Sequence, residues 1–178
     1  MAVVTLREVD APEPRRTDEG AVLLDLWCDL ACPDCGDALE LLEEVREMFG
    51  DGLSVRLRHF PLTSHVWAVA AAQCQCAAAD QGQGEAFTAL ALATVDSIEG
   101  PADYIELAEH LGLDEEAVAE ALFEGTYAAR VRDDHDEGRD LGVRGTPTFV
   151  VDGLLVDAGA TLDGARDAIV SRIRRALG

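Results

Sequence analysis

The sequence contains no lysine. All 14 of its basic residues are arginine, they stand against 35 acidic residues, and the formal net charge of the 178-residue chain is -21. The absence of lysine excludes Schiff-base and lysine general-base chemistry. The arginines form no basic patch, so a phosphate backbone or an anionic lipid surface would be repelled rather than bound. We therefore expect no nucleic acid and no membrane among the partners of this protein.

Long apolar runs are absent too. Residues 1–20 mix arginine with acidic residues and hold no stretch that could form the core of a signal peptide. No later segment reaches the roughly 18 uninterrupted apolar residues of a membrane span. These absences predict a cytoplasmic location. The five cysteines, an odd number in a reducing compartment, then favour redox, metal-binding or core roles over a structural disulfide framework.

The first half of the chain is typical of a β-α-β unit that follows a flexible lead-in at residues 1–20. Residues 21–28 are almost continuously apolar, as in a strand covered on both faces. Pro33 to Phe49 carries apolar residues at helical spacing, and residues 53–60 alternate apolar with polar. A helix between two strands over this length predicts that the strands are parallel.

The second half is predicted to be helical and then to return to strands. Residues 64–141 read as a helical insertion, and the Asp152-Gly153 pair predicts a two-residue hairpin turn. A last amphipathic helix covers residues 161–177. The other helices expected here end at residue 80, cover 85–98, cover 103–111, begin at 114 and cover 126–141. The other expected strands cover 148–151 and 154–157.

Cys32-Pro33-Asp34-Cys35 stands where the first strand ends and the first helix begins. Unpaired backbone N–H groups and the positive end of the helix dipole favour a thiolate there, so Cys32 is the expected nucleophile. Cys35, one turn on, is placed to attack the resulting mixed disulfide. Pro33 suits the first helical position, and the Asp34 carboxylate should raise the pKa of the neighbouring thiol and make the couple more reducing.

The Cys-x-x-Cys pair taken alone also fits half of a zinc site or a chance pair. A second feature supports the redox interpretation. Gly145-Thr146-Pro147 precedes the predicted strand at 148–151, where a cis bond before Pro147 is plausible. Beside Cys32, that turn would expose the backbone of Thr146 for pairing with an extended substrate.

The sequence resembles the DsbA-like branch of the thioredoxin superfamily. Four separated motifs match in order: residues 29–35, 58–62, an alanine-rich helix leading to 83–87, and 142–149. The resemblance implies an α/β fold, with a thioredoxin-like domain formed by residues 21–63 and 142–178 and an inserted all-helical subdomain at 64–141. It also implies that Cys32 and Cys35 are the redox pair and that Pro147 is the cis-proline.

The chain departs from this family at one buried position. Members often carry an acidic residue six positions before the nucleophile, where it assists proton transfer, but here that position is Leu26. The acid is Asp25, which a regular strand would direct to the opposite face. Either a proton-transfer role or simple pairing with neighbouring groups fits Asp25.

Other cysteines and histidines leave further interpretations open. Cys28, Cys32 and Cys35 have the spacing of an iron-sulfur motif, but the chain is short for the barrel that usually carries it, so Cys28 is interpreted as a small buried hydrophobe. Cys74 and Cys76 lie two residues apart, which on a helix separates their side chains too widely to chelate one ion. We expect no metal site. The remaining expectations are core packing for Cys74, Cys76, Trp27 and Trp67, a structural polar contact for His59, no ligand role for His65, and a solvated helix face for His135.

Two classes of function follow. The first is a protein disulfide oxidoreductase, acting as a reductase or isomerase through the Cys32-Cys35 dithiol and needing no cofactor beyond that redox-active disulfide. Its partners would be a disulfide-containing protein or a low-molecular-weight thiol, together with a second redox protein. The alternative is a glutathione-dependent transferase or isomerase, or a binding module without catalysis, because one fold hosts several functions.

Overall fold

The computed structural model describes residues 20–156 and 161–178. Apart from Gly20, the predicted lead-in lies outside the described residues, as does Asp157 of the predicted hairpin. The elements in chain order are β1 (Val22–Cys28), α1 (Asp34–Phe49), the 3-10 turn η1 (Gly50–Gly52), β2 (Leu53–His59), α2 (Ala68–Asp80), α3 (Gly84–Ala93), the 3-10 turn η2 (Val95–Ser97), α4 (Pro101–His110), α5 (Glu115–Glu124), α6 (Ala128–Leu141), β3 (Thr148–Val151), β4 (Leu154–Leu155) and α7 (Leu162–Leu177).

One mixed sheet organises the strands in the order β2-β1-β3-β4. β1 pairs in parallel with β2 and antiparallel with β3, as the crossover through α1 and the later return of the chain require. All seven residues of β1 are buried, which explains the continuous apolar run at 21–28. The parallel pairing predicted for the first two strands is confirmed.

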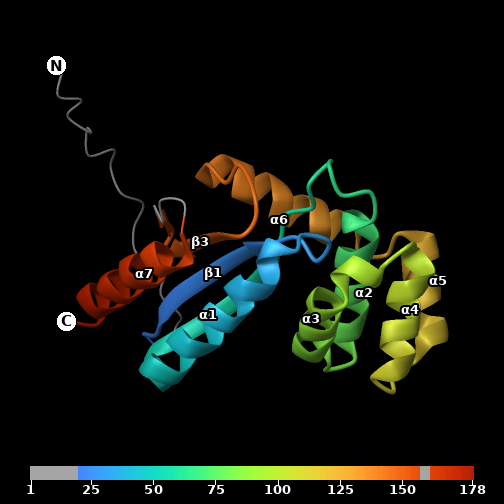
Figure 1. Ribbon diagram of the computed structural model, residues 1–178, viewed down its shortest axis with the longest axis horizontal. Helices are drawn as coiled ribbons and strands as arrows, with labels where there is room; N and C mark the ends of the chain where they lie inside the picture. The colour runs from blue at the N-terminus through green and yellow to red at the C-terminus, as the bar shows by residue number, and fades with distance from the viewer. Residues whose placement is uncertain (1–19, 157–160) are drawn as a thin grey trace, which may run out of the picture.

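Helices cover both faces of this sheet. α1 and α7 lie side by side on one face, while α6 crosses near β2 on the other (Figure 1). Alternate residues of β1 therefore enter different cores: Leu24, Leu26 and Cys28 pack toward α1, and Trp27 packs with Phe60 and Val150. The strand thus separates two chemically distinct surroundings.

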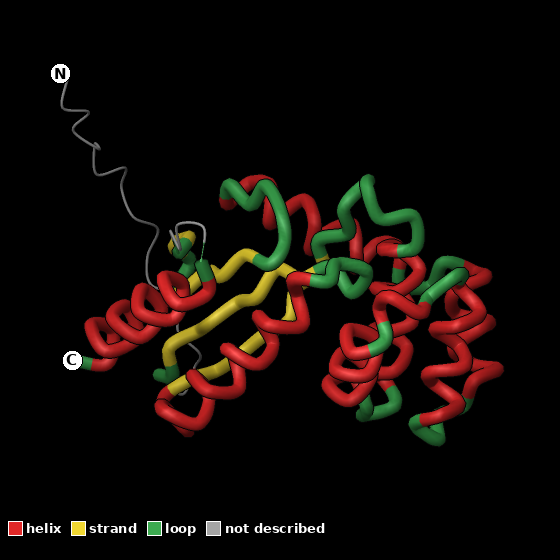
Figure 2. The backbone as a smooth tube through the Cα atoms, in the orientation of Figure 1, coloured by secondary structure: helices red, strands yellow, loops and turns green. Residues whose placement is uncertain are grey.

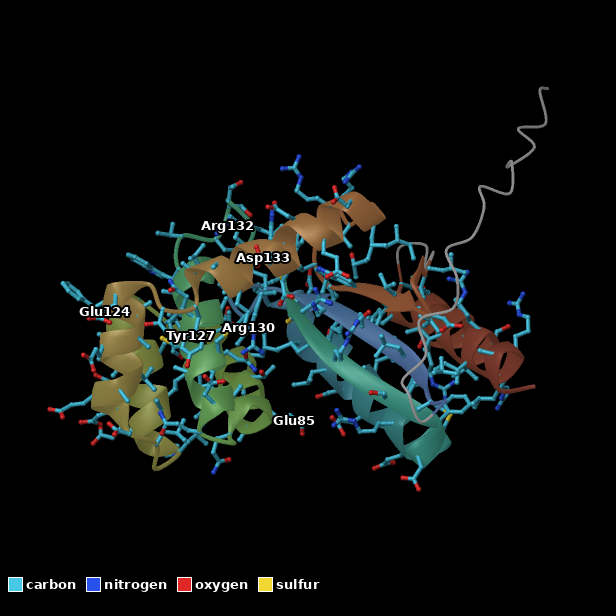
Figure 3. The ribbon with its side chains drawn as sticks, turned by 180° about the vertical axis from the view of Figure 1, so that it is seen from behind. Glu85, Glu124, Tyr127, Arg130, Arg132 and Asp133 are labelled. Carbon is cyan, nitrogen blue, oxygen red and sulfur yellow. The ribbon has the colours of Figure 1, made fainter. Side chains whose placement is uncertain are left out.

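Helices α2 to α5 form a bundle beside the sheet, and the loops that follow β1 and β2 lie at the junction between them (Figure 2). α6 returns the chain from the bundle to the sheet. At its beginning, labelled in Figure 3, the Tyr127 hydroxyl donates to Asp80 Oδ2 at 2.6 Å, and Arg130 lies 3.9 Å from the same carboxylate. This arrangement is the predicted α/β fold of the thioredoxin type with a helical insertion.

The hairpin forms as predicted, with Asp152 and Gly153 both at positive φ, 58° and 79°. That backbone is the one a two-residue turn between right-twisted strands requires. β4 is shorter than predicted, although Val156 N still donates to the Phe149 carbonyl at 2.9 Å.

Several predicted helix ends were wrong by a few residues, and local hydrogen bonds or a proline explain each case. The helix predicted at 85–98 ends at Ala93, because the Thr94 hydroxyl bonds the Leu90 carbonyl at 2.8 Å and a 3-10 turn follows. The helix predicted from 103 begins at Pro101, a favoured first helical residue. The helix predicted from 126 begins at Ala128, because Thr126 N closes α5 by bonding the Ala121 carbonyl.

Candidate functional site

Cys32 lies in the turn between β1 and α1, as its place in the sequence predicts. Its backbone N–H donates to the Asp29 carbonyl at 3.0 Å, and its own carbonyl accepts from Cys35 N at 3.1 Å. α1 begins at Asp34, one residue later than expected, with Pro33 immediately before it in helical conformation. The Cys32 side chain is 5% exposed and that of Cys35 is 0% exposed, so Cys32 is the sulfur that a substrate reaches first.

The turn before β3 meets this site from the far end of the chain. The Thr146–Pro147 peptide bond is cis, and the Cys32 thiol donates to the Thr146 carbonyl at 3.6 Å. Thr148 Oγ1 donates to the Gly145 carbonyl at 2.7 Å and holds the turn. The fold therefore brings Cys32 and Thr146 together across 114 residues of sequence, while Pro33 and Asp34 stay exposed beside them.

The electrostatics of the pair differ from the expectation for Cys32. Burial raises the pKa of Cys32, although the interaction with Thr146 and the hydrogen bond from the Asp34 backbone N–H oppose this. The pKa of Cys35 is lowered, chiefly by a hydrogen bond from the Cys28 side chain. The pKa of each of these cysteines therefore depends on its neighbours in the site, and Asp34 acts on Cys32 through its backbone N–H.

Cys28 belongs to this site, which the sequence analysis missed. Cys28 is buried at the end of β1 as predicted, and it packs in the same core cluster as Cys32 and Cys35. The pKa of Cys28 is raised well above its ordinary value by the hydrogen bond to Cys35 and by burial. Its position in β1 could have revealed this contact, because Leu24, Leu26 and Cys28 share the face that packs on α1.

Asp29 holds the surrounding loops and was also missed as a separate functional residue. It is buried, and its Oδ1 accepts from Ala31 N at 2.9 Å. Its Oδ2 accepts from Leu62 N at 2.9 Å and lies 2.8 Å from His65 Nδ1. The sequence signal that could have revealed this role is an aspartate directly before a tight turn. One carboxylate thus fixes the loop after β2 against the loop that carries Cys32.

Asp25 lies on the opposite face of β1 from this site, as expected. Arg56 Nε and the second guanidinium nitrogen donate to its two carboxylate oxygens at 2.7 and 3.0 Å. Leu26, six residues before Cys32, is buried on the α1 side. Asp25 is therefore satisfied by an ion pair within the sheet, which supports pairing over proton transfer.

The other cysteines and His59 lie apart from the candidate site. Cys74 and Cys76 are buried in separate packing clusters, and Cys76 Sγ lies 3.4 Å from His59 Nε2. That same nitrogen lies 3.0 Å from Gln75 Oε1, and burial lowers the pKa of His59. Within residues 20–156 and 161–178, no three or more cysteine, histidine or acidic side chains are grouped so that they could hold a metal ion.

Two further expectations were wrong. His135 does not lie on a freely solvated face, because its ring stacks on Phe60 with 4.4 Å between centroids. Trp67 is 37% exposed rather than part of the core. Trp27 is fully buried as expected, and its Nε1 donates to the Asp134 carbonyl at 3.1 Å beneath α6.

Comparisons with known proteins agree with this fold. A family model described as Thioredoxin matches residues 18–170. The fold is similar to BdbD from Bacillus subtilis, with a TM-score of 0.76 and 17% identity over 91% of this chain and 96% of that one. It is also similar to DsbA from Xylella fastidiosa, with a TM-score of 0.75 and 19% identity over 93% and 94% of the two chains.

Curated proteins similar in sequence carry a different name. The Na(+)/H(+) antiporter NhaA 3 of Salinispora tropica is 35% identical over 165 residues, which are 91% of this chain and 25% of that protein. The chain thus spans about a quarter of the length of these relatives. In the part of the chain that the structure describes, none of the helices has the length and apolar character needed to cross a membrane.

The two cysteines at the strand-helix turn, the opposed Thr146–Pro147 turn and the helical insertion occur together in a chain that the family model matches over most of its length. The chain belongs to the thioredoxin family, and its fold is similar to that of DsbA proteins.

Proposed function

We propose that the protein is a thiol-disulfide oxidoreductase that works through Cys32 and Cys35, as a reductase or isomerase of protein disulfides. The observation that carries this proposal is the placement of both thiols at the start of α1, with Cys32 against the Thr146 carbonyl and Cys35 buried behind it. In this mechanism the Cys32 thiolate attacks a substrate disulfide, and Cys35 then attacks the mixed disulfide and releases the reduced substrate.

The surface next to Cys32 supports a polypeptide as the substrate. Val66, Trp67 and Val69 are 78%, 37% and 49% exposed. They follow the loop that Asp29 fixes against the Cys32 turn through Leu62 and His65. Exposed apolar side chains that lie close together are typical of binding sites. We propose that this surface holds apolar segments of a disulfide-containing client while the Thr146 backbone pairs with its extended chain.

The cellular role is part of the same proposal. An odd number of cysteines suits a reducing compartment better than a structural disulfide framework, so we propose a cytoplasmic location and a second redox protein or small thiol as electron donor. The proposal needs no cofactor beyond the cysteine pair. The antiporter activity named for the curated relatives is not included, because the match covers only 25% of the first of them.

Replacement of Cys32 by serine tests the mechanism most directly. We expect Cys32→Ser to lower the rate of insulin reduction by at least about 1,000-fold, because no other exposed thiol can start the exchange. Cys74→Ala is the matched control and should keep the wild-type rate. Wild-type activity in the Cys32→Ser variant would contradict the mechanism, and no activity in either protein would favour a binding module.

The reduction potential of the Cys32-Cys35 pair then separates the directions of the reaction. Equilibration with glutathione or dithiothreitol buffers measures it. A value near about -270 mV indicates a reductase, and one near about -120 mV indicates an oxidase. The second value would contradict the direction proposed here.

A further inference from the structure

The side chain of His65 links the client surface to the turn that carries Cys32. The client surface consists of the exposed side chains of Val66, Trp67 and Val69. His65 Nδ1 lies 2.8 Å from Asp29 Oδ2, and the Asp29 side chain is 0% exposed, whereas that of His65 is 25% exposed. The Asp29 carboxylate also accepts from Ala31 N at 2.9 Å, and the Asp29 carbonyl accepts from Cys32 N at 3.0 Å. These hydrogen bonds connect the His65 ring to the backbone of Cys32.

The backbone of His65 is held on both sides. Its N–H donates to the Leu62 carbonyl at 3.1 Å, and its carbonyl accepts from the N–H of Ala68, the first residue of α2, at 3.2 Å. Two consecutive turns therefore meet at His65, and the exposed Trp67 lies in the second of them. The Leu62 N–H holds the first turn on the Asp29 carboxylate, and the His65 ring holds the second.

Loss of the His65 ring would leave the rest of this network in place. The two oxygens of the Asp29 carboxylate already accept from Ala31 N and Leu62 N, so His65 Nδ1 is a third donor to a group that keeps two. A buried carboxylate with two N–H donors still has hydrogen-bond partners, so the loops stay folded without the ring. What is lost is a bond to a carboxylate, which is stronger than one between neutral groups, and with it the position of the second turn.

We propose that His65 is a positioning residue that adapts the site to protein disulfides: through Asp29 it holds the client surface at a fixed place relative to Cys32. This inference rests on the proposed function, since it takes Cys32 as the attacking thiol. The disulfide of a protein is flanked by its own chain, and contacts of that chain with the client surface hold the disulfide at the Cys32 sulfur. A small disulfide has no such chain and gains nothing from the surface. His65 therefore favours protein clients over small disulfides.

Single-turnover reduction separates the two kinds of substrate. Reduced full-length protein is mixed with excess insulin or with glutathione disulfide, quenched in acid and alkylated, and the oxidised fraction is measured over time. In His65→Ala we expect the insulin concentration that gives half the limiting rate to rise about tenfold, the effect of losing one hydrogen bond to a charged group. The limiting rate with insulin and the rate with glutathione disulfide should stay at their wild-type values.

His65→Asn identifies the atom that carries the effect. The amide nitrogen of asparagine stands the same number of bonds from Cα as Nδ1 of histidine, so it donates to Asp29 but leaves nothing at the place of Nε2. We expect this variant to restore the wild-type dependence on insulin concentration. An Asn variant as impaired as His65→Ala would assign the effect to Nε2 and overturn the positioning role. His110→Ala, at an exposed position in the last turn of α4, is the control and should change neither reaction.

A double variant tests the link between His65 and the client surface. Trp67→Ala alone should raise the half-saturating insulin concentration about tenfold, but only about twofold in the His65→Ala background, because a surface that is no longer positioned contributes less. A combined effect of about 100-fold would show that the two residues act independently and would overturn the inference.

The outcomes keep this inference separate from the proposed function. Equal slowing of the insulin and glutathione disulfide reactions in His65→Ala would assign His65 to the general integrity of the site, and no change in either would leave His65 without a role. Both results overturn the inference alone, because the wild type still reduces insulin. Failure of the wild type to reduce either substrate overturns the proposed function.

Discussion

The five cysteines fall into two regions that are equally buried and chemically different. Cys28, Cys32 and Cys35 meet at the junction of β1 and α1, whereas Cys74 and Cys76 lie inside α2. In α2, burial raises the pKa of Cys74 to about 12 and that of Cys76 to about 11. At the junction, the hydrogen bond from Cys28 lowers the pKa of Cys35 despite its burial. Burial alone makes a thiol inert, and a neighbouring thiol donor restores its acidity.

The two regions should differ most in whether a cysteine variant traps client proteins as mixed disulfides. Cys35→Ser removes the resolving thiol but keeps Cys32, so mixed disulfides with clients should accumulate and survive non-reducing electrophoresis. Cys76→Ser is the matched change in α2 and should trap no client. Equal trapping by the two variants would erase the distinction between the regions.

Alkylation compares the two regions in the unmodified protein. With native reduced protein at pH 7.5, a maleimide should modify Cys32 at least about 100-fold faster than Cys76, because thiolate and access are both required. Cys32 is 5% exposed and adjoins the exposed Pro33 and Asp34, while Cys76 is 0% exposed with a pKa of about 11. Peptide mapping over time gives the two rates. Comparable rates would show that the thiols of the two regions do not differ in reactivity.

Alkaline pH should destabilise the protein through the α2 thiols. Above the ordinary thiol pKa of 9.0 the unfolded chain releases these protons, while the folded protein retains them until about pH 12 for Cys74 and about 11 for Cys76. Rising pH therefore favours unfolding, by up to about 1.4 kcal/mol per pH unit for each thiol. Below pH 9 their contribution is constant.

Urea unfolding of the reduced protein between pH 8 and 10.5 measures this effect. Cys74→Ala should lose stability less steeply with pH than the wild type does. Parallel curves for the two proteins would show that Cys74 is not held in its protonated form by burial.

The smallest expected effect concerns Asp34, which is exposed beside the redox pair. Asp34→His removes a negative charge and adds a partial positive one near the thiols, which favours the reduced state. Because solvent screens exposed charges, we expect a shift of only about 10 mV toward a more oxidising potential. Asp37→His, at another exposed position in the first turn of α1, is the control, and a shift of equal size there would assign the effect to the helix end in general.

Much of the fold could be predicted from local patterns. Three predicted features are present in the structure: the strand at 21–28, the strand at 53–60 and the Asp152-Gly153 turn. Each depends on neighbouring residues and on one buried face. Helix ends were less predictable. They depend on which donor reaches a free carbonyl, as Thr94 and Thr126 show.

The packing of α6 on the sheet could not be predicted. Gly138 lies so close to the Trp27 ring that a Cβ would stand 2.4 Å from its Nε1, and Arg58 lies over the same ring at 5.1 Å while pairing with Asp134 and Glu137. Asp134 and Glu137 are 76 and 79 positions from Arg58 in the chain, and Gly138 is farther still from Trp27. Local sequence patterns do not reveal contacts between residues that lie so far apart in the chain.

The sequence by itself determined the order of the elements, the place of Cys32 and Cys35 at a strand-helix turn, and the exclusion of lysine chemistry. These depend on residue type and on spacing within one or two turns of chain. Only the tertiary structure decided that Cys28 influences the pKa of Cys35, that Asp29 links two loops, and that Thr146 faces Cys32. Contacts between distant segments depend on how helices and strands pack, and packing sets the burial and the hydrogen-bond partners from which each thiol takes its pKa.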